Sequence, residues 1–147
     1  MTQPVRRPSA RVVIVNWRRP ELTIRAARSI REQLGDGDGL VVVDTASGDG
    51  SAERLSRAGL TVVESSENLG FGAGVNLGAQ NMVEDVLVLL NNDAVAEPGF
   101  LEAILAPLGD SPSAAAPAAT TARILLAGRW KPAAPGQRDA LVSPRTG

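Results

Sequence analysis

A short apolar run that ends in three polar residues constrains the fold of this chain more than any other feature. Residues 86–90 are apolar at every position and lead directly into Asn91-Asn92-Asp93. A run of this length, apolar on both faces, is typical of a strand buried in a parallel sheet. Such a strand would deliver Asp93 to the carboxyl edge of the sheet, where ligands bind in open α/β folds. In isolation Asp93 would more simply cap the next helix, but at this edge it is a candidate ligand of a divalent cation.

Three further apolar runs predict strands over residues 11–15, 40–43 and 60–64, because they are short, rich in Val and closed by polar residues. With helices between them, these strands would form an α/β fold with a mostly parallel sheet and helices on both faces. Asn16, Asp44 and Asp93 would then follow strands at the same edge. Such a convergence of polar residues exceeds what stability requires, and it predicts a site there.

Helical patterns follow each predicted strand. The first begins at Pro20, and its apolar stripe consists of Leu22, Ala26, Ile30 and Leu34. The others cover about residues 52–57, with Ser51 or Asp49 as the cap, 68–82 and 98–108. The third helix opens on Gly70, Gly72 and Gly74, which predicts close approach of the backbone to a ligand and free amides for an anion.

Composition excludes several classes of chemistry. The 147 residues include no cysteine and no histidine, which removes disulfides, structural zinc and imidazole bases. The net charge of -1 gives no basic field that would attract nucleic acid. No apolar run approaches the length of a membrane span, and residues 1–10 lack the pattern of a signal peptide. We therefore expect a cytoplasmic protein whose chemistry rests on carboxylates, hydroxyls, amides, arginines and a hard metal ion.

The chain divides into three parts. Residues 1–10 are polar with two prolines and predict a flexible leader, and residues 11–110 form the predicted α/β domain. Residues 111–147 are rich in Ala and Pro and predict a linker or disordered tail, in which residues 124–126 could add an edge strand. Within the domain, residues 35–39 alternate Gly and Asp. They lack the spacing of a calcium loop, so we interpret them as a flexible connection.

Four motifs, in order, resemble the N-terminal half of a family 2 glycosyltransferase with the GT-A fold. The resemblance is closest to the branch that contains bacterial rhamnosyltransferases, and it covers about residues 11–108. The motifs lie at residues 12–17, 41–51, 67–78 and 89–93. The resemblance implies a Rossmann-like core that binds a nucleotide-diphospho-sugar, of which this chain would be a truncated form.

The resemblance also implies the ligands and their contacts. It implies a UDP- or dTDP-sugar donor bound with Mg²⁺ or Mn²⁺, and a saccharide or lipid-linked acceptor, in the synthesis of cell-wall or surface polysaccharide. Asp93 would bind the metal and Asp44 would contact the base. The other nucleotide-binding residues that it implies are Asn16, Trp17, Asn68, Gly70, Phe71, Asn76 and Asn92. A peripheral position at the inner face of the membrane is the alternative to a free cytoplasmic one.

Two departures from the family pattern leave alternatives open. Family members usually carry Asp-Asn-Gly or Asp-Asn-Ala where this chain has Asp44-Thr45-Ala46, and nothing after residue 110 resembles the half that holds their catalytic base. We therefore assign no catalytic residue, and a truncated, inactive nucleotide-binding remnant is one alternative. Another is a dinucleotide-binding Rossmann module, suggested by Gly72, Gly74 and Gly78. Its glycines should follow the first strand, whereas these follow the third.

Overall fold

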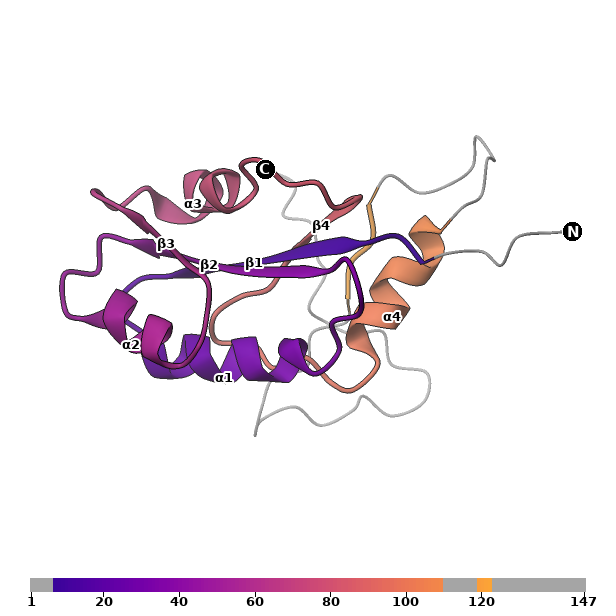
Figure 1. Cartoon of the computed structure of the whole chain (residues 1–147), viewed down its shortest axis with the longest axis horizontal. Helices are drawn as coiled ribbons and strands as arrows, with labels where there is room; N and C mark the ends of the chain where they lie inside the picture. The colour runs from indigo at the N-terminus through magenta and orange to yellow at the C-terminus, as the bar shows by residue number, and fades with distance from the viewer. Residues whose placement is uncertain (1–6, 110–118, 123–147) are drawn as a thin grey trace, which may run out of the picture.

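The four predicted strands form a parallel sheet in the order β3-β2-β1-β4. The structure is a computed structural model, and it describes residues 7–109 and 119–122. Its strands are β1 (Ala10–Asn16), β2 (Gly39–Thr45), β3 (Val62–Ser65) and β4 (Val86–Leu89). Its helices are α1 (Pro20–Arg31), α2 (Ser51–Arg57), α3 (Gly70–Gly78), α4 (Phe100–Leu105) and the 3-10 turn η1 (Ala106–Leu108). Strands and helices alternate, which confirms the predicted α/β class (Figure 1).

The register of the sheet brings the ends of the strands to one edge. β1 lies between β2 and β4, where Asn16 pairs with Asp44 and Val13 pairs with Leu89. All neighbouring strands run parallel, so the segments that leave them lie at the carboxyl edge, including residues 91–93 after β4. The predicted meeting of strand ends at one edge is confirmed.

Helices cover both faces of the sheet. α1, α2 and α4 lie on one face, and α3 lies on the other (Figure 1). The larger core lies under the first group, where the buried side chains include Val12, Ile14, Ala26, Ala27, Ile30, Val42, Leu55, Leu101 and Leu105. Alternate residues of the same strands, such as Val13 and Val43, point to α3, as the two-residue period of a strand requires.

β4 is buried on one face only, which corrects the expectation of a strand buried on both. Val88 faces the larger core and is 4% exposed, but Leu87 and Leu89 are 37% and 47% exposed. The reason is lateral position: β4 is the outer strand of the sheet in the described residues, and α3 packs over β1 and β2. The apolar run predicts the strand correctly, but it does not show which elements cover the two faces of that strand.

α1 starts where predicted, but its buried face differs from the predicted stripe. Thr23 and Ala27 are buried on it, whereas Leu22 is only half-buried. Thr23 belongs to this face because its hydroxyl donates a hydrogen bond to Oδ1 of Asn16 over 2.6 Å. The helix therefore supports the carboxyl edge of the sheet through a polar contact as well as through its apolar residues.

Two other helix termini also differ from prediction. The residue before α2 is Gly50, in the left-handed conformation with φ of 79°, and neither Ser51 nor Asp49 caps that helix with its side chain. Asp49, in the loop before α2, instead accepts a hydrogen bond from the backbone N–H of Ser51, the first residue of the helix. α3 ends at Gly78, four residues before the predicted end near 82.

At the amino edge of the sheet, Asp38 fastens the first strand. Its carboxylate accepts hydrogen bonds from the backbone N–H groups of Ala10 and Gly35, each over 2.8 Å, and pairs with Arg7. The interpretation of residues 35–39 as a flexible connection is therefore wrong. This loop is a structural anchor, and its position opposite the carboxyl edge keeps it away from the predicted site.

Some expectations fall outside the described residues, namely the first part of the leader, the edge strand over 124–126 and almost all of the tail. Among the residues that the structure does describe, every helix is too short or too polar to cross a membrane.

Candidate functional site at the carboxyl edge

A buried network of polar side chains joins the ends of β1 and β2. Asn16 has no exposed surface, and its amide N–H group donates to Oδ2 of Asp44 over 2.9 Å. Ser47, in the loop after β2, donates its hydroxyl to the same oxygen over 2.6 Å and its backbone N–H to Oδ1 over 3.0 Å. With Thr23 donating to Asn16, the network ties two strands, a loop and α1 together.

This network changes the roles expected of Asn16 and Asp44. Both ends of the Asn16 amide are engaged within the protein, so its contribution to ligand binding is indirect. Asp44 is 4% exposed, and its carboxylate already accepts three hydrogen bonds from Asn16 and Ser47. A contact between Asp44 and a nucleotide base stays a prediction. Such a contact would have to use the lone pairs of the carboxylate oxygens that these three hydrogen bonds leave free.

An open cleft of about 390 Å³ lies beside this network, between the ends of β2 and β3. It is lined by Asp44, the loop after β2, the first turn of α2 and residues 64–66 at the end of β3. Its volume falls within the range of small-molecule sites. The exposed side chains of Glu53 and Glu64 line it and have no hydrogen-bond or ion-pair partner in the described part of the chain. The cleft therefore offers hydrogen-bond acceptors to a ligand with N–H groups, such as a base.

An aromatic side chain and an arginine follow β1 at the same edge. Trp17 is 48% exposed, and the guanidinium of Arg18 lies 5.2 Å from the centre of its ring. An exposed indole at the same sheet edge as the cleft can stack on a base or a sugar, which is consistent with the predicted role of Trp17.

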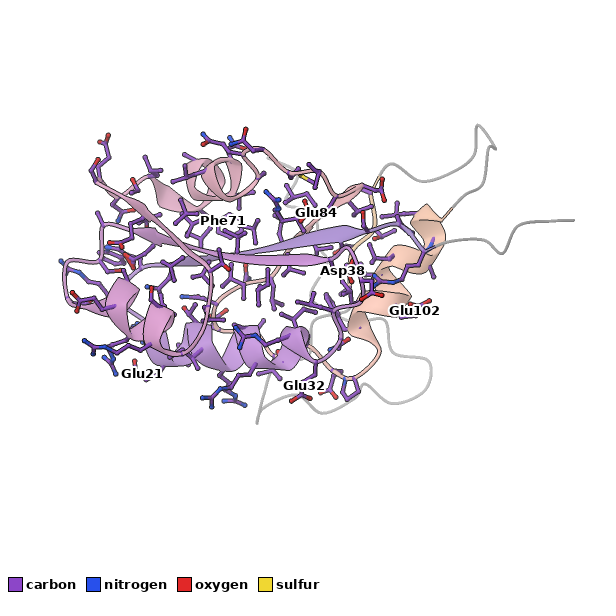
Figure 2. The ribbon with its side chains drawn as sticks, viewed as in Figure 1. Glu21, Glu32, Asp38, Phe71, Glu84 and Glu102 are labelled. Atoms are coloured by element: carbon purple, nitrogen blue, oxygen red, sulfur yellow. The ribbon has the colours of Figure 1, made fainter. Side chains whose placement is uncertain are left out.

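The residues predicted from the start of α3 have two kinds of role. Asn68 is exposed and accepts a hydrogen bond from the backbone N–H of Gly70 over 3.0 Å, so the first amide of this helix is not free for an anion. Phe71, labelled in Figure 2, is 51% exposed, and Asn76 is also exposed. A contact between either side chain and a nucleotide stays a prediction.

Two of the glycines of α3, Gly74 and Gly78, serve packing rather than ligand approach. A Cβ atom at Gly78 would lie 2.6 Å from Cγ1 of Val13, and one at Gly74 would lie 3.0 Å from Cγ1 of Val15. Only the absence of a side chain lets the helix lie this close to the sheet. At Gly72 the space is open, so the predicted close approach of a ligand can apply there but not at Gly74.

Asp93 follows β4, and its side chain is exposed without a hydrogen-bond or ion-pair partner in residues 7–109 and 119–122. Asn92 beside it is half-buried. The described residues contain no group of three or more metal-ligating side chains, so Asp93 does not belong to a self-contained metal site. A single carboxylate fits Mg²⁺ or Mn²⁺ that arrives with phosphate oxygens, because such ions keep few protein ligands beside their phosphates and waters.

Sequence reasoning missed part of the site. Ser47 and Glu64 were not candidates in their own right, although they hold the network and line the cleft. The apolar stripe predicted for α1 leaves out Thr23, because that stripe consists of apolar residues alone. The sequence does carry a signal for Thr23: its helical spacing from Ala27 and Ile30 places it on the same buried face of the helix.

Comparison with known proteins identifies the family. The model of the family described as Glycosyl transferase family 2 matches residues 11–138, which is most of the chain. The chain belongs to this family. A comparison with curated protein sequences finds no significant match.

Solved structures similar to this family 2 chain share its fold. A mannosyltransferase from Pyrobaculum calidifontis, solved with GDP-Man and Mn²⁺, is 25% identical with a TM-score of 0.57, and the match covers 63% of this chain and 32% of that one. Glucosyl-3-phosphoglycerate synthase from Mycobacterium tuberculosis, solved with UDP, is 26% identical with a TM-score of 0.56, covering 69% and 40%. The same enzyme solved with Mn²⁺, UDP-glucose and phosphoglyceric acid is 26% identical with a TM-score of 0.56, and the match covers 69% of this chain and 39% of that one. The chain thus matches less than half the length of each, and the GT-A fold is shown.

Proposed function

We propose that residues 11–110 are the donor-binding domain of a glycosyltransferase, which transfers a sugar from a nucleotide-diphosphate donor to a saccharide or lipid-linked acceptor. The observation that carries this proposal is that the exposed carboxylate of Asp93 shares one sheet edge with the cleft between β2 and β3. Family membership and the nucleotides and Mn²⁺ named for the similar structures support it.

In this proposal the nucleoside occupies the cleft and the diphosphate extends toward β4. Asp44 and Glu64 would accept hydrogen bonds from the base, and Trp17 would cover the base or the ribose. The remaining contacts proposed for the donor are Asn68, Gly70, Phe71, Asn76 and Asn92, with Asn16 acting through Asp44. Asp93 would hold Mg²⁺ or Mn²⁺, which when bound neutralises charge that develops on the leaving diphosphate.

The finer assignment is a rhamnosyltransferase-like enzyme of cell-wall or surface polysaccharide synthesis that uses a UDP- or dTDP-sugar. The resemblance of the four motifs supports it. We further propose a cytoplasmic protein, free or peripheral at the inner face of the membrane. Measuring release of UDP or dTDP from UDP-glucose and dTDP-rhamnose, with and without saccharide acceptors, tests the donor and separates an active enzyme from an inactive nucleotide-binding remnant.

Calorimetric titration tests the site itself. UDP, dTDP and GDP are each added to the chain with Mn²⁺ and again with excess chelator, and we expect at least one of them to bind only with the metal. Asp93→Asn keeps the size of the side chain but removes its charge, so metal-dependent binding should fall at least tenfold, the scale of a charged interaction of about 1.5–3 kcal/mol.

Asp36→Asn is the matched control, because Asp36 is also exposed but lies in the loop before β2, at the opposite edge of the sheet. It removes the same charge and should leave binding unchanged. Equal binding with and without Mn²⁺, or an equal loss in both variants, would contradict the role proposed for Asp93.

A further inference from the structure

Arg18 is held in an unusual backbone conformation at the carboxyl edge. Its φ angle is 53°, in the left-handed region that residues other than glycine and asparagine adopt at a cost. Its backbone N–H donates to Oγ of Ser47 over 2.8 Å, which fastens it to the network around Asp44. A strained residue fixed to a ligand cleft by a buried network is a reason to ask what its side chain does there.

The guanidinium of Arg18 is held in position, but most of its N–H groups have no hydrogen-bond acceptor among the described residues. Its Nε atom donates to the carbonyl oxygen of Ser47 over 3.0 Å, and its central carbon, Cζ, lies over the ring of Trp17. The side chain is exposed, and its charge interacts with the nearby carboxylate of Asp49. Its two terminal nitrogens have no hydrogen-bond or ion-pair partner in the described parts of the chain. A guanidinium carries five N–H donors, so four remain to be offered to a ligand in a fixed orientation.

The strand order places Arg18 between the two halves of the proposed donor site. The cleft lies at the ends of β2 and β3, Asp93 follows β4, and β1 with Arg18 after it lies between them. Neighbouring strands are about 4.8 Å apart, so β2 and β4 are separated by roughly 10 Å across the width of the sheet. A ligand with its nucleoside in the cleft and its diphosphate near Asp93 has to cross the end of β1.

We propose that Arg18 binds the diphosphate of the nucleotide donor through its terminal nitrogens, as a positive charge supplied by the protein beside the metal. Arginine suits this role because its planar fork matches two phosphate oxygens at once. The inference rests on the proposed function, since it takes the cleft as the nucleoside site and Asp93 as the metal ligand.

The test compares a nucleoside diphosphate with its nucleoside. Arg18→Asn removes the guanidinium but keeps the backbone N–H that binds Ser47, and asparagine accepts the left-handed conformation more readily than arginine. This variant should therefore unfold at the same temperature as the wild type or higher. With Mn²⁺ present, we expect its Kd for UDP, or for whichever of UDP, dTDP and GDP binds best, to rise about tenfold, while its affinity for the matching nucleoside, measured by NMR titration, stays unchanged.

Two further variants sharpen the result. Arg18→Lys keeps the charge without the fork and should give a Kd between those of the wild type and Arg18→Asn. Arg25→Gln removes one exposed positive charge from α1 and should leave both affinities unchanged. Raising the salt concentration should shrink the difference between the wild type and Arg18→Asn, because ions screen an exposed charge.

Each other outcome has a distinct meaning. If Arg18→Asn weakens the nucleoside and the nucleoside diphosphate equally, Arg18 only supports the cleft, and the proposal is overturned. An unchanged Kd for the nucleoside diphosphate overturns it as well. If the wild type binds none of the three diphosphates with Mn²⁺, the proposed function itself fails, which the first two outcomes would leave standing.

Discussion

At the scale of single residues, Asp38 is a carboxylate whose side chain is shielded from water. Its side chain is 1% exposed. Burial raises the pKa of Asp38, but the hydrogen bonds from the backbone N–H groups of Gly35 and Ala10 and the nearby guanidinium of Arg7 outweigh burial and hold the pKa below its ordinary value. The ionised form of Asp38, which is labelled in Figure 2, is therefore favoured in the folded protein.

This shift makes the stability of the protein depend on pH. A carboxylate with a lowered folded pKa stabilises the fold above its unfolded pKa, about 3.9, and that stabilisation is lost as the pH falls through the folded pKa. We expect Asp38→Asn to lower the free energy of unfolding at pH 7, and the difference from the wild type to shrink as the pH falls below about 4. Urea unfolding at a series of pH values measures both effects. Asp36→Asn, which alters an exposed side chain in the same loop, should change neither, and a pH-independent difference for Asp38→Asn would contradict the ionic explanation.

At the scale of elements, the fit of α3 on the sheet depends on one glycine far more than on another. A Cβ atom at Gly78 would lie 2.6 Å from Cγ1 of Val13 and 2.9 Å from Cγ2 of Val43, whereas one at Gly72 meets nothing within 4 Å. Both glycines belong to the same helix, so they share the cost of a flexible backbone. They differ chiefly in what surrounds them, although Gly72 lies in the first turn of α3 and Gly78 is its last residue.

Alanine substitutions at these two glycines should therefore change stability in opposite directions. Gly72→Ala should raise the free energy of unfolding by about 0.5–1 kcal/mol, the helix preference of alanine over glycine. Gly78→Ala gains the same preference but forces the helix off the sheet, and overpacking of this kind costs about 1–3 kcal/mol. Denaturant unfolding of the two variants measures the difference. If Gly78→Ala is as stable as Gly72→Ala, the close packing of α3 on β1 and β2 is wrong.

At the scale of the whole molecule, the two edges of the sheet are built for different purposes. The amino edge is closed by the pairs Arg7–Asp38 and Arg11–Glu84, the second at 2.9 Å. The carboxyl edge carries the open cleft, the exposed Trp17 and Asp93, whose side chain has no partner among the residues that the structure describes. A ligand that binds at the carboxyl edge should leave the amino edge unaffected.

Hydrogen exchange followed by mass spectrometry can test this division. With UDP and Mn²⁺ at about ten times the Kd, we expect slower exchange in the segments after the strands, namely residues 16–18, 44–51, 64–66 and 91–93. Segments at the amino edge, residues 7–10, 35–38 and 84–85, should exchange at the same rate with and without ligand. Uniform slowing would indicate stabilisation of the whole fold by mass action, and slowing at the amino edge alone would place the ligand elsewhere.

Sequence reasoning reached the element order and the shared strand edge because short Val-rich runs and helix starts are local signals. It failed where the outcome depended on neighbours distant in the sequence. The exposure of Leu89 follows from β4 lying at the side of the sheet in the described residues, and the packing of Gly78 follows from two valines on separate strands. The hydrogen bonds that join Asn16 to Asp44 link residues 28 positions apart, so the strand register was needed to see them.

The closed network of Asn16, Asp44, Ser47 and Thr23 has a consequence for how such a chain can diverge. Each member satisfies another in a buried place, so one replacement leaves a polar group without a partner, while a matched pair of replacements can restore the balance. Evolutionary drift at these four positions should therefore proceed in coordinated steps. In a library of random variants, single changes at Asn16 or Asp44 would be purged, and survivors would carry compensating changes at their hydrogen-bond partners.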